Sequence, residues 1–360
     1  MDYWKTGSRS EDLVSAVKIL VSRLRFIGDI VLTTPVIEAL RKKFPDSTID
    51  YLGDKHGVTL LANNPYLDMI IPYDFESWEV AEQIKVVRFL KKKSYDVAID
   101  LFGNPRSAIV VLLSGAKMRI GGAFGWRRRV FTHPITVTDH ISAVSFHLRY
   151  LAPLGINEDY RPPRIYLTES ERVEAVRYLT SLGLECAKPI VGLHLGATWP
   201  AKVWQAESYA RLADLLQDDI GAQIVVTYGP KDVRYLEAFA NSTKCIYKIV
   251  HPGGLRRLAS MISCFDLYVS NDAAPMHISA AVGIPTIGIF GPGNPDIWFP
   301  YERNLGQVPL KKEVGCCGKD HCDFKGAEYM KCMKSMSPGE VFDQASLILK
   351  TTNVPGSKVQ

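Results

Sequence analysis

Short apolar runs alternate along the chain with longer segments that place apolar residues at helical spacing, and this alternation occurs in two series. An apolar run of about four to eight residues is typical of a buried strand, whereas apolar residues three and four positions apart are typical of a helix. In the first series, we expect strands at 18–24, 47–52, 68–71, 96–101 and 118–120, and helices at 30–43, 56–62, 79–93 and 104–114. In the second series, we expect strands at 190–195, 222–227, 246–249, 266–270 and 285–290, and helices at 205–217, 231–240, 255–263 and 275–282. Strands that alternate with helices predict parallel sheets covered by helices on both faces.

The length of 360 residues exceeds what one hydrophobic core usually supports, so two domains are expected. A stretch at 154–163, rich in proline and polar residues, marks the approach to a linker, and a helix at 169–183 joins the two halves. The predicted organisation is an N-terminal extension (1–17), a first domain (18–165), a second domain (166–345) and a C-terminal tail (346–360).

The segment from Ser270 to His277 has the pattern of a strand that turns directly into a helix. Asn271 or Asp272 can cap this helix, and Pro275 lacks an N–H that the first turn leaves unpaired in any case. The remaining amides and the helix dipole favour a negative ligand such as a diphosphate. A well-capped helix without a ligand is the alternative interpretation.

Two further strand-to-helix turns have the same character. Asp29 follows the strand at 18–24, while Thr198 and Lys202 follow the strand at 190–195. Ligands of open α/β sheets bind outside the carboxyl ends of the strands, where Asp29, Thr198, Lys202 and Asp272 are all expected. The alternatives are that Asp29 is only a helix N-cap and that Lys202 is a solvated loop lysine.

These three turns, in this order, resemble the motifs of glycosyltransferase family 9, whose best-known members are the lipopolysaccharide heptosyltransferases. The resemblance rests on residues 25–35, 196–204 and 271–277 together with Phe290-Gly291-Pro292, and it extends from about Lys18 to about Val341. The family usually carries Ser-Gly or Thr-Gly after the last aspartate, whereas this chain has Ala273-Ala274. A hydroxyl ligand is thereby lost and a glycine position gains a Cβ, while donation by the backbone is retained.

The resemblance implies a GT-B fold, an α/β architecture in which two Rossmann-like domains with parallel sheets face each other across a cleft. It implies an inverting, metal-independent transfer of heptose from ADP-heptose to a lipopolysaccharide-core acceptor, with no cofactor. Asp29 would be the base in the acceptor-binding first domain, and Lys202 would stabilise the leaving diphosphate. The residues expected to bind the donor in the second domain are Thr198, Asp232, Asn271, Asp272, Ala273, Ala274, Pro275, Met276 and His277.

Three alternatives stay open at this point. Asp232 could accept hydrogen bonds from ribose hydroxyls or could only cap a helix. The same fold could use another nucleotide-sugar donor. The chain could also be a catalytically silent protein that binds a nucleotide sugar, because of Ala273 and Ala274.

The net charge of +5 is too small to indicate nucleic-acid binding, but it suits an anionic substrate or lipid surface. Arg127, Arg128 and Arg129 concentrate positive charge in the first half, and we expect them to bind an anionic glycolipid acceptor. A solvated charged face is the alternative. No secretory or membrane-spanning segment is evident, so a cytoplasmic protein with peripheral contact to the inner membrane is expected. The first strand is not followed by a G-x-G-x-x-G motif, which disfavours a nicotinamide cofactor.

The seven cysteines fall into two sets. Cys186, Cys245 and Cys264 are scattered and are expected to be reduced core residues. Cys316, Cys317, Cys322 and Cys332 cluster near His321, so zinc or an iron–sulfur centre is one interpretation. Because this spacing matches no usual metal motif, we favour a disulfide or free thiols that hold a loop. The family resemblance implies a structural role.

Overall fold

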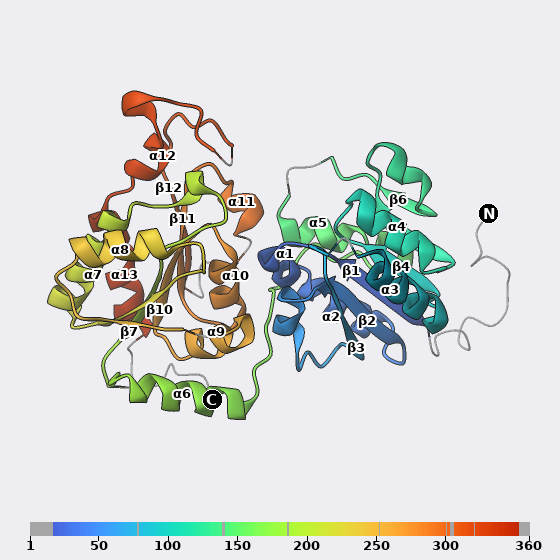
Figure 1. Ribbon diagram of the computed structural model, residues 1–360, viewed down its shortest axis with the longest axis horizontal. Coiled ribbons are helices and arrows are strands. Elements are labelled where there is room, and N and C mark those ends of the chain that lie inside the picture. Colours follow the sequence, from blue (N-terminus) through green and yellow to red (C-terminus); the bar gives the residue numbers. More distant parts are fainter. Residues whose placement is uncertain are drawn as a thin grey trace. The chain divides into compact units, whose positions relative to one another are not determined.

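The computed structural model describes residues 17–77, 79–138, 141–185, 187–251, 253–299, 301–302, 306–319 and 321–352. The chain forms two compact units, one made of Met1–Asp139 and Val144–Arg161 and the other of His140–Ala143 and Pro162–Gln360. Each unit is built around one parallel sheet (Figure 1). The predicted α/β architecture with two parallel sheets is confirmed.

The first sheet has the strand order β3-β2-β1-β4-β5-β6, and all its strand pairs are parallel. Its strands are β1 (Lys18–Arg23), β2 (Thr48–Asp54), β3 (Met69–Tyr73), β4 (Val97–Asp100), β5 (Met118–Gly122) and β6 (His133–Ile135). The second sheet has the order β12-β11-β10-β7-β8-β9, also with parallel pairs throughout. Its strands are β7 (Ile190–His194), β8 (Gln223–Thr227), β9 (Tyr247–Ile249), β10 (Leu267–Asn271), β11 (Thr286–Phe290) and β12 (Gln307–Lys311).

Both orders are those of the doubly wound Rossmann arrangement, in which the chain reverses its direction of travel at one point in the sheet. This point lies between β1 and β4 in the first unit and between β7 and β10 in the second. Ligands of such sheets bind at the switch point, outside the carboxyl ends of the strands. The loops after these four strands are therefore the expected position of a ligand.

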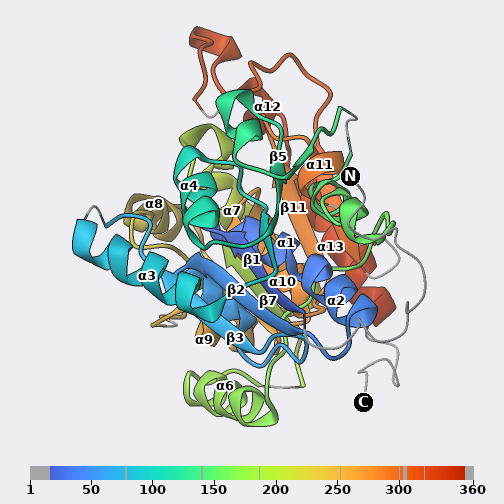
Figure 2. The same ribbon diagram turned by 90° about the vertical axis from the view of Figure 1, so that its right-hand side faces the viewer.

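Helices cover both faces of the first sheet (Figure 2). The helices are α1 (Ile27–Leu32), α2 (Thr34–Lys43), α3 (Val80–Lys93), α4 (Pro105–Leu113) and α5 (Ala143–Arg149), with 3-10 turns η1 (Gly57–Leu61), η2 (Gly125–Arg129) and η3 (Ala152–Leu154). Helices α3 and α4 bury Leu90, Ala108 and Val111 against one face, and α1 and α2 lie on the other.

The helix expected at 30–43 is divided into α1 and α2 at Thr33. Pro35 has no N–H to donate to the carbonyl of Val31, so the regular ladder is interrupted there. The hydroxyl of Thr34 donates to that carbonyl instead, at 2.8 Å. The interruption keeps α1 a separate short element that carries Asp29.

The second unit has helices α6 (Glu169–Ser181), α7 (Ala206–Ile220), α8 (Val233–Ser242), α9 (Leu255–Ile262), α10 (Ala274–Ala281), α11 (Pro295–Trp298), α12 (Lys331–Lys334) and α13 (Pro338–Thr352), with 3-10 turns η4 (Pro200–Lys202) and η6 (Gly326–Glu328). Figure 1 shows α7 and α13 on one face of the sheet and α9 and α10 on the other. Helix α13 buries Val341, Ala345 and Leu349 in the core, so the tail predicted from residue 346 begins inside a packed helix.

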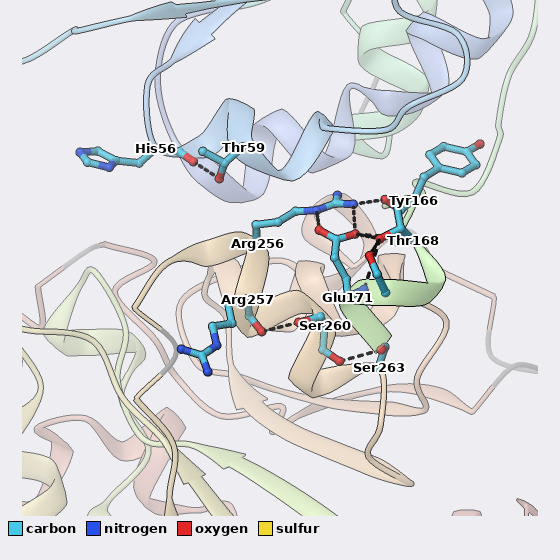
Figure 3. A network of polar contacts seen from close by, with 10 residues as sticks. His56, Thr59, Tyr166, Thr168, Glu171, Arg256, Arg257, Ser260 and Ser263 are labelled. Atoms are coloured by element: carbon cyan, nitrogen blue, oxygen red, sulfur yellow. Dashed lines mark hydrogen bonds and ion pairs between the residues drawn. The ribbon is translucent and has the colours of Figure 1, made fainter. Parts of the chain in front are cut away.

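Helix α6 is joined firmly to α9 in this unit (Figure 3). The guanidinium of Arg256 in α9 binds the carboxylate of Glu171 with its Nε 2.6 Å from Oε1, and it also donates to the carbonyl of Tyr166. The same carboxylate accepts the N–H of Thr168 at 2.8 Å, which completes a capping box at the start of α6. Residues 166–168, which precede α6, are therefore held against α9, one of the helices that pack on the second sheet.

Candidate functional site

Asp29 lies at the carboxyl edge of the first sheet, in the first turn of α1. The N-cap of this helix is Phe26, whose φ of 65° is in the left-handed region, and no side chain caps the helix. One carboxylate oxygen of Asp29 lies 2.6 Å from Nη2 of Arg23, the last residue of β1. The interpretation of Asp29 as only an N-cap is therefore wrong, because its carboxylate forms an ion pair across the turn.

Arg23 joins the two strands at the switch point of the first sheet. Its Nη1 donates to the carbonyl of Leu101, which directly follows β4, at 2.6 Å. Its Cζ lies 5.0 Å from the ring centroid of Phe102 in the same loop. Sequence reasoning missed this residue, since an arginine at the end of an apolar strand does not by itself indicate a partner.

Asp100 ends β4 beside this arginine and is fully buried. Its carboxylate accepts hydrogen bonds from the Phe102 N–H at 3.0 Å, the Gly103 N–H at 3.3 Å and the Ser107 hydroxyl at 2.8 Å. Burial raises the pKa of Asp100 to about 6, although these hydrogen bonds and the charge of Arg23 act in the opposite direction. The switch point of the first sheet thus holds one cation between two carboxyl groups.

Arg127, Arg128 and Arg129 form η2, which follows β5 at the same carboxyl edge. Arg127 is half-buried with its Cζ 5.6 Å from the ring centroid of Phe124, whereas Arg128 and Arg129 are exposed. A Cβ on Gly103 would lie 2.8 Å from the Phe124 ring, so the loops after β4 and β5 are in close contact. The arginine cluster therefore lies at the carboxyl edge of the first sheet, as Arg23 and Asp29 do.

In the second unit, Lys202 of η4 forms an ion pair with Asp272, the residue after β10. Their Nζ and Oδ2 atoms lie 2.7 Å apart, and the side chains are only 17% and 6% exposed. A solvated loop lysine would be far more exposed, so that interpretation of Lys202 is wrong.

Helix α10 begins at Ala274 with Ala273 as its N-cap, and no side chain caps it. The expectation that Asn271 or Asp272 caps this helix is wrong. Ala273, Ala274 and Pro275 are half-buried at the helix start, so this end presents main chain and Cβ atoms.

The side chain of Asn271 is used within the protein. Its Oδ1 accepts the N–H of Trp204 at 2.9 Å, and its Nδ2 donates to the carbonyls of Leu195 and Gly196, each at 3.1 Å. Asn271 therefore ties β10 to the loop after β7 across the switch point. Its side chain therefore has partners within the protein, and its contact with the donor stays a prediction.

The loop after β11 lies directly against Asp272. A Cβ on Gly293 would lie 2.4 Å from Oδ2 of Asp272, so only glycine allows this approach. The carbonyl of Gly293 accepts a hydrogen bond from Nζ of Lys311 at 3.0 Å. The segment 291–296 therefore borders the same edge as the Lys202–Asp272 pair.

Asp232 is buried in the loop after β8. Its Oδ2 accepts the N–H of Gly229 at 2.9 Å, and no side chain caps α8, so helix capping is wrong as an explanation of this carboxylate. A Cβ on Gly196 would lie 1.9 Å from the same oxygen, which places Asp232 against the loop that leads to Lys202. Burial raises the pKa of Asp232.

The remaining residues that were predicted to bind the donor differ in how far their side chains are buried. Thr198 is exposed in the loop before η4. Met276 is buried in a cluster with Phe290 and Phe299, so its side chain belongs to the core. His277 is also buried, and burial together with the nearby charge of Lys202 lowers its pKa to about 4 although Asp272 opposes this. His277 is therefore neutral at pH 7.

The clustered cysteines lie after β12 and before α13. The thiols of Cys316 and Cys332 are hydrogen-bonded, which together with burial raises the pKa of Cys332 to about 12. Cys317 interacts with Cys322, and backbone N–H groups lower the pKa of Cys317. Cys245 and Cys264 are half-buried, and the thiol of Cys264 donates to the carbonyl of Ser260, while Cys186 lies outside the described residues. Among the described residues, no group of three or more His, Cys, Asp or Glu side chains is arranged to hold a metal ion.

No helix within the described part of the chain has both the length and the apolar character needed to cross a membrane.

Comparisons with known proteins agree with this arrangement. The model of glycosyltransferase family 9 (heptosyltransferase) matches residues 83–328. Lipopolysaccharide heptosyltransferase 3 of Escherichia coli strain K12 is 30% identical over 299 residues, which cover 79% of this chain and 85% of that protein.

Solved structures show the same fold. The family 9 glycosyltransferase of Veillonella parvula has a TM-score of 0.82 at 24% identity, covering 94% of this chain and 98% of that chain. The ADP-heptose lipopolysaccharide heptosyltransferase II of E. coli has a TM-score of 0.77 at 22% identity, covering 94% and 100%. The predicted GT-B type fold with two Rossmann-like domains is confirmed. From the match of the family model over most of the sequence, the chain belongs to glycosyltransferase family 9.

Proposed function

We propose that this protein transfers a heptose from ADP-heptose to a lipopolysaccharide-core acceptor, with inversion at the anomeric carbon. Family membership supports glycosyl transfer, and the names of the related heptosyltransferases support the donor and the class of acceptor. The observation that carries the proposal is the pairing of Lys202 with Asp272 beside the start of α10. A buried cation next to a helix N-terminus is suited to a diphosphate leaving group.

The chemistry divides between a base and a site for the leaving group. Asp29 takes the proton of the acceptor hydroxyl as that oxygen attacks the anomeric carbon. Lys202 and the first-turn amides of α10 stabilise the charge that develops on the departing diphosphate. A single displacement of this kind inverts the configuration, and it proceeds without a metal ion because the protein supplies the positive charge.

The donor nucleotide is assigned to the second domain, residues 166–345, and the acceptor to the first, residues 18–165. Asp232 is a buried carboxylate in the loop after β8 and is suited to accept hydrogen bonds from ribose hydroxyls. Thr198 is exposed and free to turn its hydroxyl toward a phosphate. Arg127, Arg128 and Arg129 are suited to phosphates or carboxylates of the acceptor.

An acceptor carried on lipid requires an approach to a membrane surface. Ile109, Leu112 and Leu113 are exposed at positions i, i+3 and i+4 of α4, which places them on one helix face. Trp126 is exposed in η2 next to the arginine cluster. Apolar and basic side chains of this kind support peripheral contact with an anionic bilayer.

A transfer assay tests the proposal. Purified protein is incubated with ADP-heptose and heptose-deficient lipopolysaccharide core, and the mass of the acceptor is followed with time. We expect a mass gain of one heptose and release of ADP. Transfer from a different nucleotide sugar would correct the donor. Binding of ADP-heptose without transfer to any core acceptor would favour a silent binding protein, which is the alternative raised by Ala273 and Ala274.

A further inference from the structure

We infer that Arg23 is a positioning residue that fixes the carboxylate of Asp29 for proton abstraction. The inference rests on the role proposed for Asp29, but it concerns a residue outside the sequence motifs of the three turns. It follows from the place of Arg23 at the switch point and from the number of groups that this side chain holds.

The guanidinium of Arg23 is fixed on two sides. Nη2 lies 2.6 Å from Oδ1 of Asp29, and Nη1 donates to the carbonyl of Leu101 at 2.6 Å. The ring of Phe102 lies against the guanidinium, with 5.0 Å from Cζ to the ring centroid. A planar fork held between a carbonyl and an aromatic ring has little freedom to rotate, and the bound carboxylate shares this restriction.

The loss of stability expected from burying Arg23 indicates that this side chain has more than a structural role. Arg23 is only 8% exposed, and within the described part of the chain its buried Nε has no hydrogen-bond partner. An unsatisfied buried donor lowers the stability of a fold. Asp29, in contrast, lies in a short helix that starts from a strained residue, Phe26, so its orientation depends on an external contact.

Arg23 also sets the charge that surrounds Asp29. The ionisable groups of other elements that interact electrostatically with Arg23 are Tyr51 of β2, Asp100 of β4, His147 of α5 and Tyr150 after α5. Burial lowers the pKa of His147 to about 3, and Arg23 adds to this effect, so His147 is neutral. Burial raises the pKa of both tyrosines above the ordinary value, so they are neutral as well. Of these groups, Arg23 supplies the positive charge that opposes Asp29 and Asp100.

Loss of Arg23 should shift the pH dependence of the transfer rate. A base acts in its ionised form, so the rate rises as pH increases through the pKa of Asp29. A neighbouring cation favours the ionised form of a carboxyl group. Removal of the cation therefore moves the acidic limb of the pH–rate profile to higher pH.

The experiment compares Arg23→Gln and Arg23→Lys with the wild type. We expect Arg23→Gln to lower kcat by about 10- to 100-fold, the loss typical of residues that orient metal ligands through a hydrogen bond, with the KM for the donor unchanged. Arg23→Lys keeps the charge but not the fork. Its acidic limb should stay near the wild-type position, while kcat recovers only in part.

Arg41 provides a matched control in the same unit. Its Nη2 lies 2.6 Å from Oδ2 of Asp68, and its Nη1 donates to the carbonyls of Pro45 at 2.9 Å and Ser47 at 2.6 Å. Arg41→Gln thus removes a comparable ion pair with backbone contacts. It should change the melting temperature but leave the pH profile and kcat as they are.

Two measurements separate this inference from the proposed function. A carbon-13 NMR titration of the Asp29 carboxyl group should show a higher pKa in Arg23→Gln than in the wild type, whether or not Asp29 is the base. In a double variant, adding Arg23→Gln to Asp29→Asn should cost no further rate, because both act through the same carboxylate. An unchanged Asp29 pKa together with wild-type kcat in Arg23→Gln would overturn the inference. Full transfer by Asp29→Asn would overturn the proposed role of the base, on which the inference rests, while the NMR titration would still show whether Arg23 stabilises the ionised carboxylate.

Discussion

The ammonium of Lys202 lies 2.7 Å from the carboxylate of Asp272, at the switch point of the second sheet. The pair joins η4, which follows β7, to the residue after β10. Asp272 holds the lysine in place. A diphosphate at this edge would therefore meet an oriented cation whose position does not have to be set during the reaction.

Replacing Lys202 with Met should separate the catalytic use of this pair from its structural use. The variant leaves the buried Asp272 without its cation, and breaking a buried pair in this way costs about 3–5 kcal/mol. The partial exposure of Lys202 places the expected loss at the lower end of this range. Turnover should fall by about 100- to 1,000-fold, as for other preorganised electrostatic groups.

The double variant Lys202→Met with Asp272→Asn is the control. It removes both charges, so the melting temperature should recover most of the loss while turnover stays low. If turnover recovers together with stability, the lysine acts only in folding, and the leaving group is stabilised elsewhere.

Chelators should leave turnover unchanged. In the proposed mechanism, Lys202 and the start of α10 supply the positive charge that a divalent ion provides in other glycosyltransferases, and the sequence has no Asp-x-Asp motif. The test is the initial rate in EDTA, with and without added magnesium or manganese. Inactivation that either ion reverses would show that a metal takes part.

Replacing Gly293 with Ala should weaken binding of the donor. The new Cβ would lie 2.4 Å from Oδ2 of Asp272, so the carboxylate or the loop has to shift. Overpacking of this kind typically lowers stability by about 1–3 kcal/mol. At this position it would displace Asp272 and so disturb the Lys202–Asp272 ion pair. Gly315→Ala is the matched control, because a Cβ at Gly315 meets no atom within 4 Å. Equal donor affinity in both variants, measured by calorimetry, would exclude Gly293 from the site.

The sheets could be predicted from sequence because apolar strands buried on both faces form a strong signal. The ten predicted strands all occur, whereas β6 and β12 were missed. These two contain Pro134 and Pro309, and both lie at sheet edges, where proline is tolerated. Proline weakens the strand signal at such edges, although the edge strand β3, which contains Pro72, was still predicted from the apolar residues before it.

The site could be predicted only to the level of its loops. Motifs placed Asp29, Lys202 and Asp272 after strands, and the structure has them there. Whether a polar side chain faces a ligand or the protein depends on contacts between distant residues. Asn271 binds the loop at 195–196, and Arg23 binds Leu101, about 75 positions away in each case. Local pattern contains no information about such pairings.

The arginine cluster of η2 should affect only the acceptor. Replacing Arg127, Arg128 and Arg129 with Ala removes three positive charges from the first unit, so we expect a higher KM for a phosphorylated acceptor. The Kd for the donor should not change, because the donor is assigned to the second domain. A weaker donor affinity, with the acceptor KM unaltered, would reverse the assignment of the two domains.

Asp29→Asn is the most direct test of the proposed mechanism. Removing a general base typically lowers the rate by about 100- to 10,000-fold, so transfer should collapse while the donor still binds. From the sequence alone, Asn would replace Asp29 at little cost to folding, since the two residues cap helices about equally. The ion pair with Arg23 changes this expectation, because the variant leaves a buried guanidinium without its charged partner.

The loss of stability should be limited, because the Asn oxygen still accepts a hydrogen bond from Nη2 of Arg23. A hydrogen bond that loses its charge assistance costs about 1–2 kcal/mol, so the melting temperature should fall by several degrees. Assays well below that temperature then report on chemistry and not on unfolding. Asp68→Asn removes the partner of Arg41 in the same unit and serves as the control, with lower stability but normal transfer. If Asp29→Asn is folded, binds the donor and transfers sugar as fast as Asp68→Asn, the base has to be another residue.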